Sequence, residues 1–188
     1  MLKRVFGSSS AAYKGRFLLN IIPVQTEIWE LSFEFVLELE VQTWHNILRL
    51  TTAAAENSLH TMGWRLPSIY VHANKLGIRY SSDTQGSAPA LDIPIDLNRK
   101  HQLKMRQYRN FYDTGQLFKD VFLDGELVAH RVHGQYQEPF RNVKFFLSER
   151  NYRSAPVRVT NLIYTPNLLY PGMLHSLSFN SKILSLKT

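Results

Sequence analysis

The sequence predicts an all-β protein, a two-sheet antiparallel jelly-roll sandwich, and three observations carry this prediction. Apolar and polar residues alternate strictly over residues 28–40, which is the pattern of a long half-buried strand. Asp124-Gly125 separates two further alternating runs within residues 117–132, and an Asx-Gly pair in that setting is typical of a two-residue β-hairpin. Turn residues recur roughly every ten residues with no helical periodicity, as in β-sandwiches.

Turn residues bound each expected strand. The expected strands span residues 17–22, 28–40, 44–51, 66–72, 76–81, 93–97, 102–110, the two arms of the 117–132 hairpin, 143–148 and 157–164. Pro23 ends the first, which is expected at a sheet edge because proline cannot donate to a ladder. The third strand is expected to pair antiparallel with the second, and Asn74 lies in the tight turn between the fourth and fifth. Alternation places Trp29 and Phe33 in the core.

The second half of the chain is organised around the 117–132 hairpin. Before it, the basic strand 102–110 should bury Leu103 and Met105 and expose its cations. In the hairpin, one face is expected to carry Val121, Leu123, Leu127 and Ala129, and the other Asp120, Glu126 and Arg131. A hairpin cannot bury its apolar face alone, so a larger sheet packed on a second layer is required. A polar loop is expected over residues 149–156, before the last strand.

Composition limits the class of protein. At 188 residues with 44% apolar content, the chain suits one domain over residues 17–165, with a flexible lead-in (1–16) and a C-terminal extension packed on the sandwich (166–188). There are no cysteines, which excludes disulfides and thiolate chemistry. The N-terminus lacks the continuous apolar stretch of a signal peptide, and no segment is long enough to span a membrane. The net charge of +7 permits attraction to polyanions.

Three stretches carry a family resemblance. They are WELSFEFVLELEVQTWHNILRLTT, LFKDVFLDGELVAHRV and FRNVKFFLSERNYRSAPVRVTNLIYT. Together they resemble the concanavalin A-like lectin/glucanase superfamily, and within it the laminin-G-like recognition domains, over residues 17–165. The resemblance implies a jelly roll, an extracellular setting, and binding of a glycan or a protein surface through loops and the concave sheet face. The galectin sugar-site motif and the metal loop of legume lectins are not matched, so no cofactor and no metal are expected.

A catalytic alternative rests on acidic residues of the strand 28–40. Alternation places Glu34, Glu38 and Glu40 on one face, and carboxyl groups two residues apart on a strand have spacing suited to glycoside hydrolysis. The Asp that β-glucanases of the superfamily place between their two glutamates is absent. A solvated sheet face is the favoured interpretation, and the chain is expected not to be an enzyme.

Candidate ligand-binding residues are arginines and tyrosines in or near loops, where binding residues tend to gather. They are Arg65, Tyr108, Arg109, Tyr112, Arg150 and Tyr152. The second half is rich in cations, and residues 27–40 hold only acidic charges; cross-strand neutralisation is favoured over a face for a sulfated or acidic glycan. No nucleic-acid motif is present. A structural or assembly scaffold, such as an adhesive or coat component, is the other open possibility.

Overall fold

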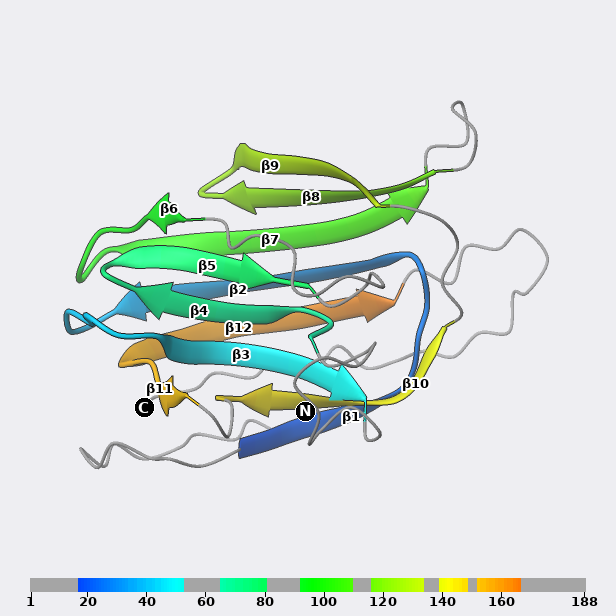
Figure 1. Ribbon diagram of the computed structural model, residues 1–188, viewed down its shortest axis with the longest axis horizontal. Coiled ribbons are helices and arrows are strands. Elements are labelled where there is room, and N and C mark those ends of the chain that lie inside the picture. Colours follow the sequence, from blue (N-terminus) through cyan, green and yellow to red (C-terminus); the bar gives the residue numbers. More distant parts are fainter. Residues whose placement is uncertain are drawn as a thin grey trace.

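The computed structural model describes residues 17–52, 65–80, 92–109, 116–133, 139–148 and 152–166. Within them the chain forms two stacked sheets and no helix, so the predicted all-β sandwich is confirmed. The strands of the two layers overlap in projection and run in nearly the same direction (Figure 1), as in aligned β-sandwiches. The expected lead-in and, apart from Pro166, the C-terminal extension lie outside the described residues.

Twelve strands make up the described part of the chain. They are β1 (Phe17–Gln25), β2 (Trp29–Leu37), β3 (His45–Thr52), β4 (Ser68–His72), β5 (Lys75–Arg79), β6 (Ile93–Pro94), β7 (Lys100–Arg109), β8 (Leu117–Leu123), β9 (Glu126–His133), β10 (Phe140–Leu147), β11 (Arg153–Ser154) and β12 (Val157–Pro166). One sheet has the order β1-β10-β3-β4-β5-β6, with β11 pairing β3 in parallel. The other, called the five-stranded sheet below, has the order β12-β2-β7-β8-β9.

The core lies between the two layers and follows the predicted alternation. Buried and half-buried residues alternate along all nine residues of β2, so Trp29 and Phe33 are buried as expected. On β7, Leu103 and Met105 are fully buried. Apolar side chains from the two layers therefore meet in one continuous core, which holds the sheets together by removing apolar surface from water.

Several expectations about pairing and boundaries are wrong. The strands expected over 28–40 and 93–97 end already at Leu37 and Pro94. β3 pairs with β10 and β4 in the other sheet, not with β2, because the chain crosses between the layers after Leu37. β1 continues through Pro23 to Gln25. Among the described strands, β1 lies at the sheet edge with β10 as its one partner, where a residue without an N–H is tolerated. The expected polar loop before the last strand contains β11, which pairs with the start of β3.

The central hairpin is confirmed, but its register shifts. Asp124 (φ 53°) and Gly125 (φ 88°) both have positive φ, as a type I′ turn requires. A bulge between Val121 and Phe122 makes Val121 pair with Ala129 while Phe122 pairs with Leu127. A bulge moves every later residue to the other face.

Two predicted side-chain directions in the hairpin are wrong. Leu127 was expected in the core, but it lies on the turn side of the bulge, pairs with Phe122 and is 54% exposed. Arg131 was expected beside Asp120, yet it pairs with Lys119, which is buried against the ring of Tyr80. Ala129 does lie against the core as predicted. His130 becomes the cross-strand partner of Asp120.

Candidate functional site

A cluster of aromatic and charged side chains occupies the outer face of the five-stranded sheet. It consists of Arg106 and Tyr108 on β7, Phe118, Asp120 and Phe122 on β8, and His130 on β9. We call these six residues the outer platform. They share a face because cross-strand partners point to the same side: Asp120 is opposite both Arg106 and His130, and Phe118 is opposite Tyr108.

Asp120 is the centre of the outer platform. Its side chain is only 3% exposed, and Arg106 donates to Oδ2 from both Nε (2.9 Å) and Nη2 (2.7 Å). His130 Nδ1 lies 2.6 Å from Oδ1. A carboxylate can only accept hydrogen bonds, so Nδ1 carries the hydrogen of that bond. Within the described part of the chain, Nε2 of His130 has no hydrogen-bond partner, and its ring is 47% exposed.

Flat side chains surround this carboxylate. Phe118 stacks on Tyr108 (5.8 Å between ring centroids) and on His130 (5.2 Å). The guanidinium of Arg106 lies 4.8 Å from the ring of Tyr108 and 5.1 Å from that of Phe122. Planar groups held in mutual contact have few rotamers to lose when a ligand binds. The outer platform is therefore pre-organised.

Electrostatics fix the protonation states of two platform groups. Burial acts to raise the pKa of Asp120, but hydrogen bonds from His130 and Arg106 outweigh it and hold the pKa below its usual range. Burial and the negative charge of Asp120 raise the pKa of the Tyr108 hydroxyl. Around neutral pH, Asp120 is thus an acceptor whose two oxygens are occupied, and Tyr108 keeps its proton.

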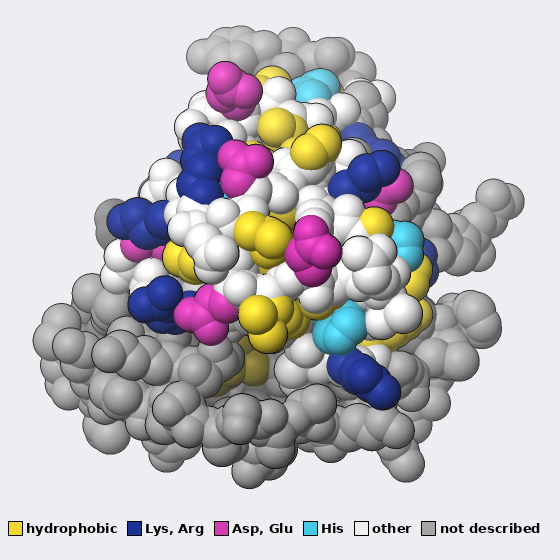
Figure 2. All heavy atoms as spheres, turned by 90° about the vertical axis from the view of Figure 1, so that its left-hand side faces the viewer, with side chains coloured by type: hydrophobic (Ala, Val, Ile, Leu, Met, Phe, Trp, Pro, Cys, Tyr) yellow, Lys and Arg dark blue, Asp and Glu magenta, His cyan; other side chains and the backbone are white. Residues whose placement is uncertain are grey.

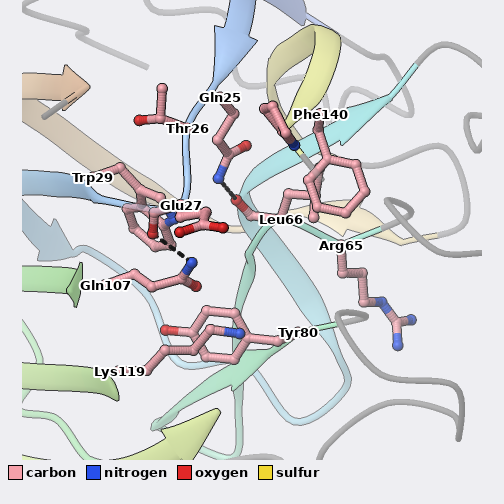
Figure 3. Close-up of a pocket in the computed structure, with 11 residues that line it drawn as sticks. Gln25, Thr26, Glu27, Trp29, Arg65, Leu66, Tyr80, Gln107, Lys119 and Phe140 are labelled. Carbon is pink, nitrogen blue, oxygen red and sulfur yellow. Dashed lines mark hydrogen bonds between the residues drawn. The ribbon is translucent and has the colours of Figure 1, made fainter. Parts of the chain in front are cut away.

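A second polar region is a crevice between the sheets, at the end where β1 turns into β2 (Figure 3). Gln107 Nε2 donates to the backbone carbonyl of Glu27 (2.6 Å), and Gln25 Nε2 donates to that of Leu66 (3.1 Å). Lys119 Nζ lies over the Tyr80 ring, 4.3 Å from its centroid, and burial raises the pKa of the Tyr80 hydroxyl. The crevice offers about 20 Å³ to the centre of a water molecule, room for about one water. It is too small for a sugar ring.

The predicted binding residues are spread over three places. Tyr108 belongs to the outer platform. Arg109 pairs with Glu27 at the crevice (2.6 Å). Arg65 and Tyr152 both contact Tyr70, with the guanidinium 5.7 Å and the Tyr152 ring 5.2 Å from its centroid. Tyr70 is fully buried on the face of β4 opposite the core residues Ile69 and Val71.

The other two predicted residues, Tyr112 and Arg150, lie outside the described residues. The structure thus brings Arg65 and Tyr152 together around Tyr70, and it separates both from Tyr108. It also adds to Tyr108 the other five residues of the outer platform, none of which is among the predicted ligand-binding residues.

The glutamates of the catalytic alternative are each engaged. Glu34 accepts from Asn161 (2.9 Å) and Thr160 (3.2 Å) and lies 3.4 Å from Lys100. Glu38 pairs with Arg158 (3.2 Å). Glu40 accepts from Asn74 (3.4 Å). Among the described residues, no three histidine or acidic side chains group as metal ligands.

Charges of opposite sign are matched across the strands. Glu30 pairs with Lys104 at 2.9 Å, diagonally across β2 and β7, as cross-strand neutralisation predicts. At the end that carries the β8–β9 turn, positive and negative side chains of the described residues lie beside one another, with no large patch of one sign among them (Figure 2). Arg99 pairs there with Asp96 (2.8 Å) and lies 3.5 Å from Asp124. The cations of the described residues are therefore not gathered on this end.

Comparison with known proteins adds evidence on the fold. No family model and no curated protein matches the sequence. Among solved structures, a fungal endo-β-1,4-glucuronan lyase from Trichoderma reesei has a TM-score of 0.50 at 14% identity, covering 76% of this chain and 66% of that chain. A Trypanosoma rangeli sialidase has a TM-score of 0.51 at 13% identity, covering 74% of this chain and 20% of that chain. The chain thus spans just under two thirds of the lyase and a fifth of the sialidase.

At such identities these likenesses show the fold alone. They support a jelly-roll sandwich consistent with the concanavalin A-like architecture predicted from sequence. A laminin-G-like subfamily, an extracellular setting and the domain boundaries stay predictions. Among the described residues there is no helical segment with the length and hydropathy of a membrane span.

Proposed function

We propose that the chain is a non-catalytic recognition module that binds a glycan on the outer platform. The observation that carries this proposal is the combination of stacked rings with exposed polar groups on one sheet face. Tyr108, Phe118 and His130 form one row of stacked rings across three strands. The apolar C–H face of a sugar packs on such rings, and its hydroxyls hydrogen-bond to groups such as Arg106 and His130.

The crevice is the weaker candidate for this role. Its polar groups are engaged in contacts within the fold. Gln25 and Gln107 donate hydrogen bonds to backbone carbonyls, and Glu27 forms an ion pair with Arg109. The room inside it suits a water molecule. The outer platform, in contrast, lies on an open sheet face where a sugar chain can be laid without displacing core side chains.

The proposal of a non-catalytic module draws on the glutamates as well. A retaining glycosidase needs two carboxyl groups that act on one bond, one of them as an acid. Glu34 and Glu38 are instead paired with cations from different strands, β7 and β12. These pairs favour a structural role for both side chains.

A glycan array with matched variants tests the proposal. We expect the wild-type protein to bind a subset of glycans and Tyr108→Ala to lose at least tenfold in affinity, because one end of the ring row is removed. Trp44→Ala removes a ring that stacks on His72 (4.7 Å between centroids) at the other sheet, and it should leave binding unchanged. Absence of binding to every glycan would favour the scaffold alternative.

The same glycans test for catalysis. Bound oligosaccharides incubated with the protein should show no new reducing ends and no new ultraviolet absorbance from an unsaturated sugar. Turnover that disappears in Glu34→Gln or Glu38→Gln would establish the glycoside hydrolase and overturn the non-catalytic proposal.

A further inference from the structure

We propose that the outer platform selects an acidic sugar, whose carboxylate is bound by the unused fork of Arg106. This inference rests on the proposed function and names the class of glycan. Asp120 already occupies one edge of the Arg106 guanidinium. Arg106 contacts Asp120 through Nε and Nη2, which is the side-on edge.

The end-on edge of Arg106 is left for a ligand. A guanidinium has five N–H donors, and Asp120 takes two, so about three remain on Nη1 and Nη2. The side chain is 44% exposed, and the described residues supply it no second carboxylate within ion-pairing distance. Two N–H groups in a plane match the two oxygens of a carboxylate, which makes a bidentate pair.

The outer platform offers the N–H groups of Arg106 to an anion and has no accessible carboxylate to repel it. Asp120 is its one carboxylate, is 3% exposed, and has both oxygens taken by Arg106 and His130. A ligand therefore meets the N–H groups of Arg106 and the Nε2 atom of His130, which accepts a hydrogen bond in the neutral imidazole because Nδ1 carries the hydrogen. A carboxylate, which only accepts, suits the N–H groups of Arg106, and a neighbouring sugar hydroxyl can donate to Nε2.

Arg106 differs from three other cations on the same face of the sheet in how exposed its partner carboxylate is. Lys100, Lys104 and Arg158 pair with Glu34, Glu30 and Glu38, whose side chains are themselves 22%, 40% and 38% exposed. An incoming anion would be repelled by those exposed carboxylates. At Arg106 the partner carboxylate is buried, and contacts with Tyr108 and Phe122 fix the plane of the guanidinium.

The test compares ligands that differ only in the acid group. Isothermal titration would measure binding of an oligouronate, its carboxyl-reduced neutral counterpart of the same linkage and length, and a sulfated neutral oligosaccharide. The protein is used as wild type, Arg106→Gln, which keeps an amide donor toward Asp120, and Arg106→Lys, which keeps the charge but lacks the fork. Lys100→Gln is the matched control, because it removes one cation from the same face of the same strand.

We expect the oligouronate to bind at least tenfold more tightly than its neutral counterpart. Arg106→Gln and Arg106→Lys should both lose this preference, and Lys100→Gln should keep it; circular dichroism and melting curves establish that the variants are folded. Equal affinity for the acidic and neutral ligands would overturn the acidic-sugar inference and leave the proposed function standing. A preference for the sulfated ligand over the oligouronate would also overturn it, because the inference specifies a carboxylate. No binding to any ligand would overturn the proposed function itself.

Discussion

The five-stranded sheet and its β8–β9 turn hold two aspartate–histidine pairs, which differ in what surrounds the imidazole. Asp124 Oδ2 is 2.8 Å from His101 Nδ1, and Asp120 Oδ1 is 2.6 Å from His130 Nδ1. His101 is only 3% exposed, stacks on Phe35, and accepts the backbone N–H of Asp96 at Nε2 (3.1 Å). His130 is half exposed. The same contact is therefore closed off in one pair and open to a ligand in the other.

The closed pair serves the fold. Asp124 Oδ1 accepts the backbone N–H of Gln102 (2.8 Å), and the Asp124 N–H donates to the Gln102 carbonyl (2.9 Å). The turn of the hairpin is thus tied to the neighbouring strand β7. Burial acts to raise the pKa of Asp124, but these hydrogen bonds outweigh it and lower the pKa. Under the proposed function, access to the imidazole, and not the pair itself, distinguishes the binding pair from the structural one.

The largest effect is expected when the closed pair is broken. Asp124→Ala removes the acceptor for His101 and Gln102 and places alanine at φ 53°, so we expect it to lower the free energy of unfolding by about 2–4 kcal/mol. Glycan affinity should not change. Urea denaturation measures the first quantity and titration the second. Asp96→Ala is the control: its carboxylate is 67% exposed and pairs with Arg99, so the loss should stay under about 1 kcal/mol. Similar losses in both variants would contradict the assigned role of Asp124.

A change at the open pair should lower glycan affinity, which a change at the closed pair leaves unaltered. Asp120→Asn keeps the size of the side chain but replaces one acceptor by a donor that faces Arg106 or His130. We expect glycan affinity to fall about tenfold, about 1.4 kcal/mol, because both ligand-contacting groups lose their fixed orientation. Asp124→Asn, the same change at the closed pair, should leave affinity unchanged. A loss of affinity in Asp124→Asn equal to that in Asp120→Asn would remove the distinction between the two pairs.

Acid should weaken both pairs. The pKa values of Asp120 and Asp124 are lowered in the folded protein, whereas an unfolded aspartate titrates near about 3.9. Above that pH both states are ionised and the stabilisation is fully present. As the pH falls below that value, the unfolded state binds protons before the folded state does. The free energy of unfolding therefore decreases until the pH has passed the lower pKa of the folded state. Urea midpoints between pH 5 and pH 2 should fall less steeply in Asp120→Asn and in Asp124→Asn than in the wild type; an unchanged slope in both would contradict the lowered pKa values.

Much of the closed pair's setting could be predicted from sequence, and the open pair could not. Asp124-Gly125 marks the turn, because few residue pairs tolerate positive φ at both positions. A regular hairpin from that turn, however, pairs Asp120 with Ala129 and Lys119 with His130. The bulge between Val121 and Phe122 changes these partners to His130 and Arg131.

The signal that would have revealed the outer platform is therefore the bulge, and the apolar run Leu127-Val128-Ala129 hides it. Within that run, shifting the strand by one residue leaves an apolar side chain facing the core in either register. Val128 and Ala129 both lie against the core, and Leu127 is exposed. Long-range pairing was also hidden: the crossing from β2 to β3 places neighbours in sequence on different sheets, which alternation alone does not encode.

The smallest effect is expected from the turn glycine, and it separates backbone strain from side-chain contacts. A Cβ on Gly125 would meet nothing within 4 Å, but φ is +88°. Gly125→Ala should therefore cost about 1 kcal/mol of unfolding free energy from backbone strain alone. Gly125→Asn should cost less, since asparagine adopts positive φ more readily. Both variants should keep glycan affinity, because neither pair is touched. A loss as large as that of Asp124→Ala would mean that the backbone of the turn, and not the Asp124 carboxylate, holds the hairpin against β7.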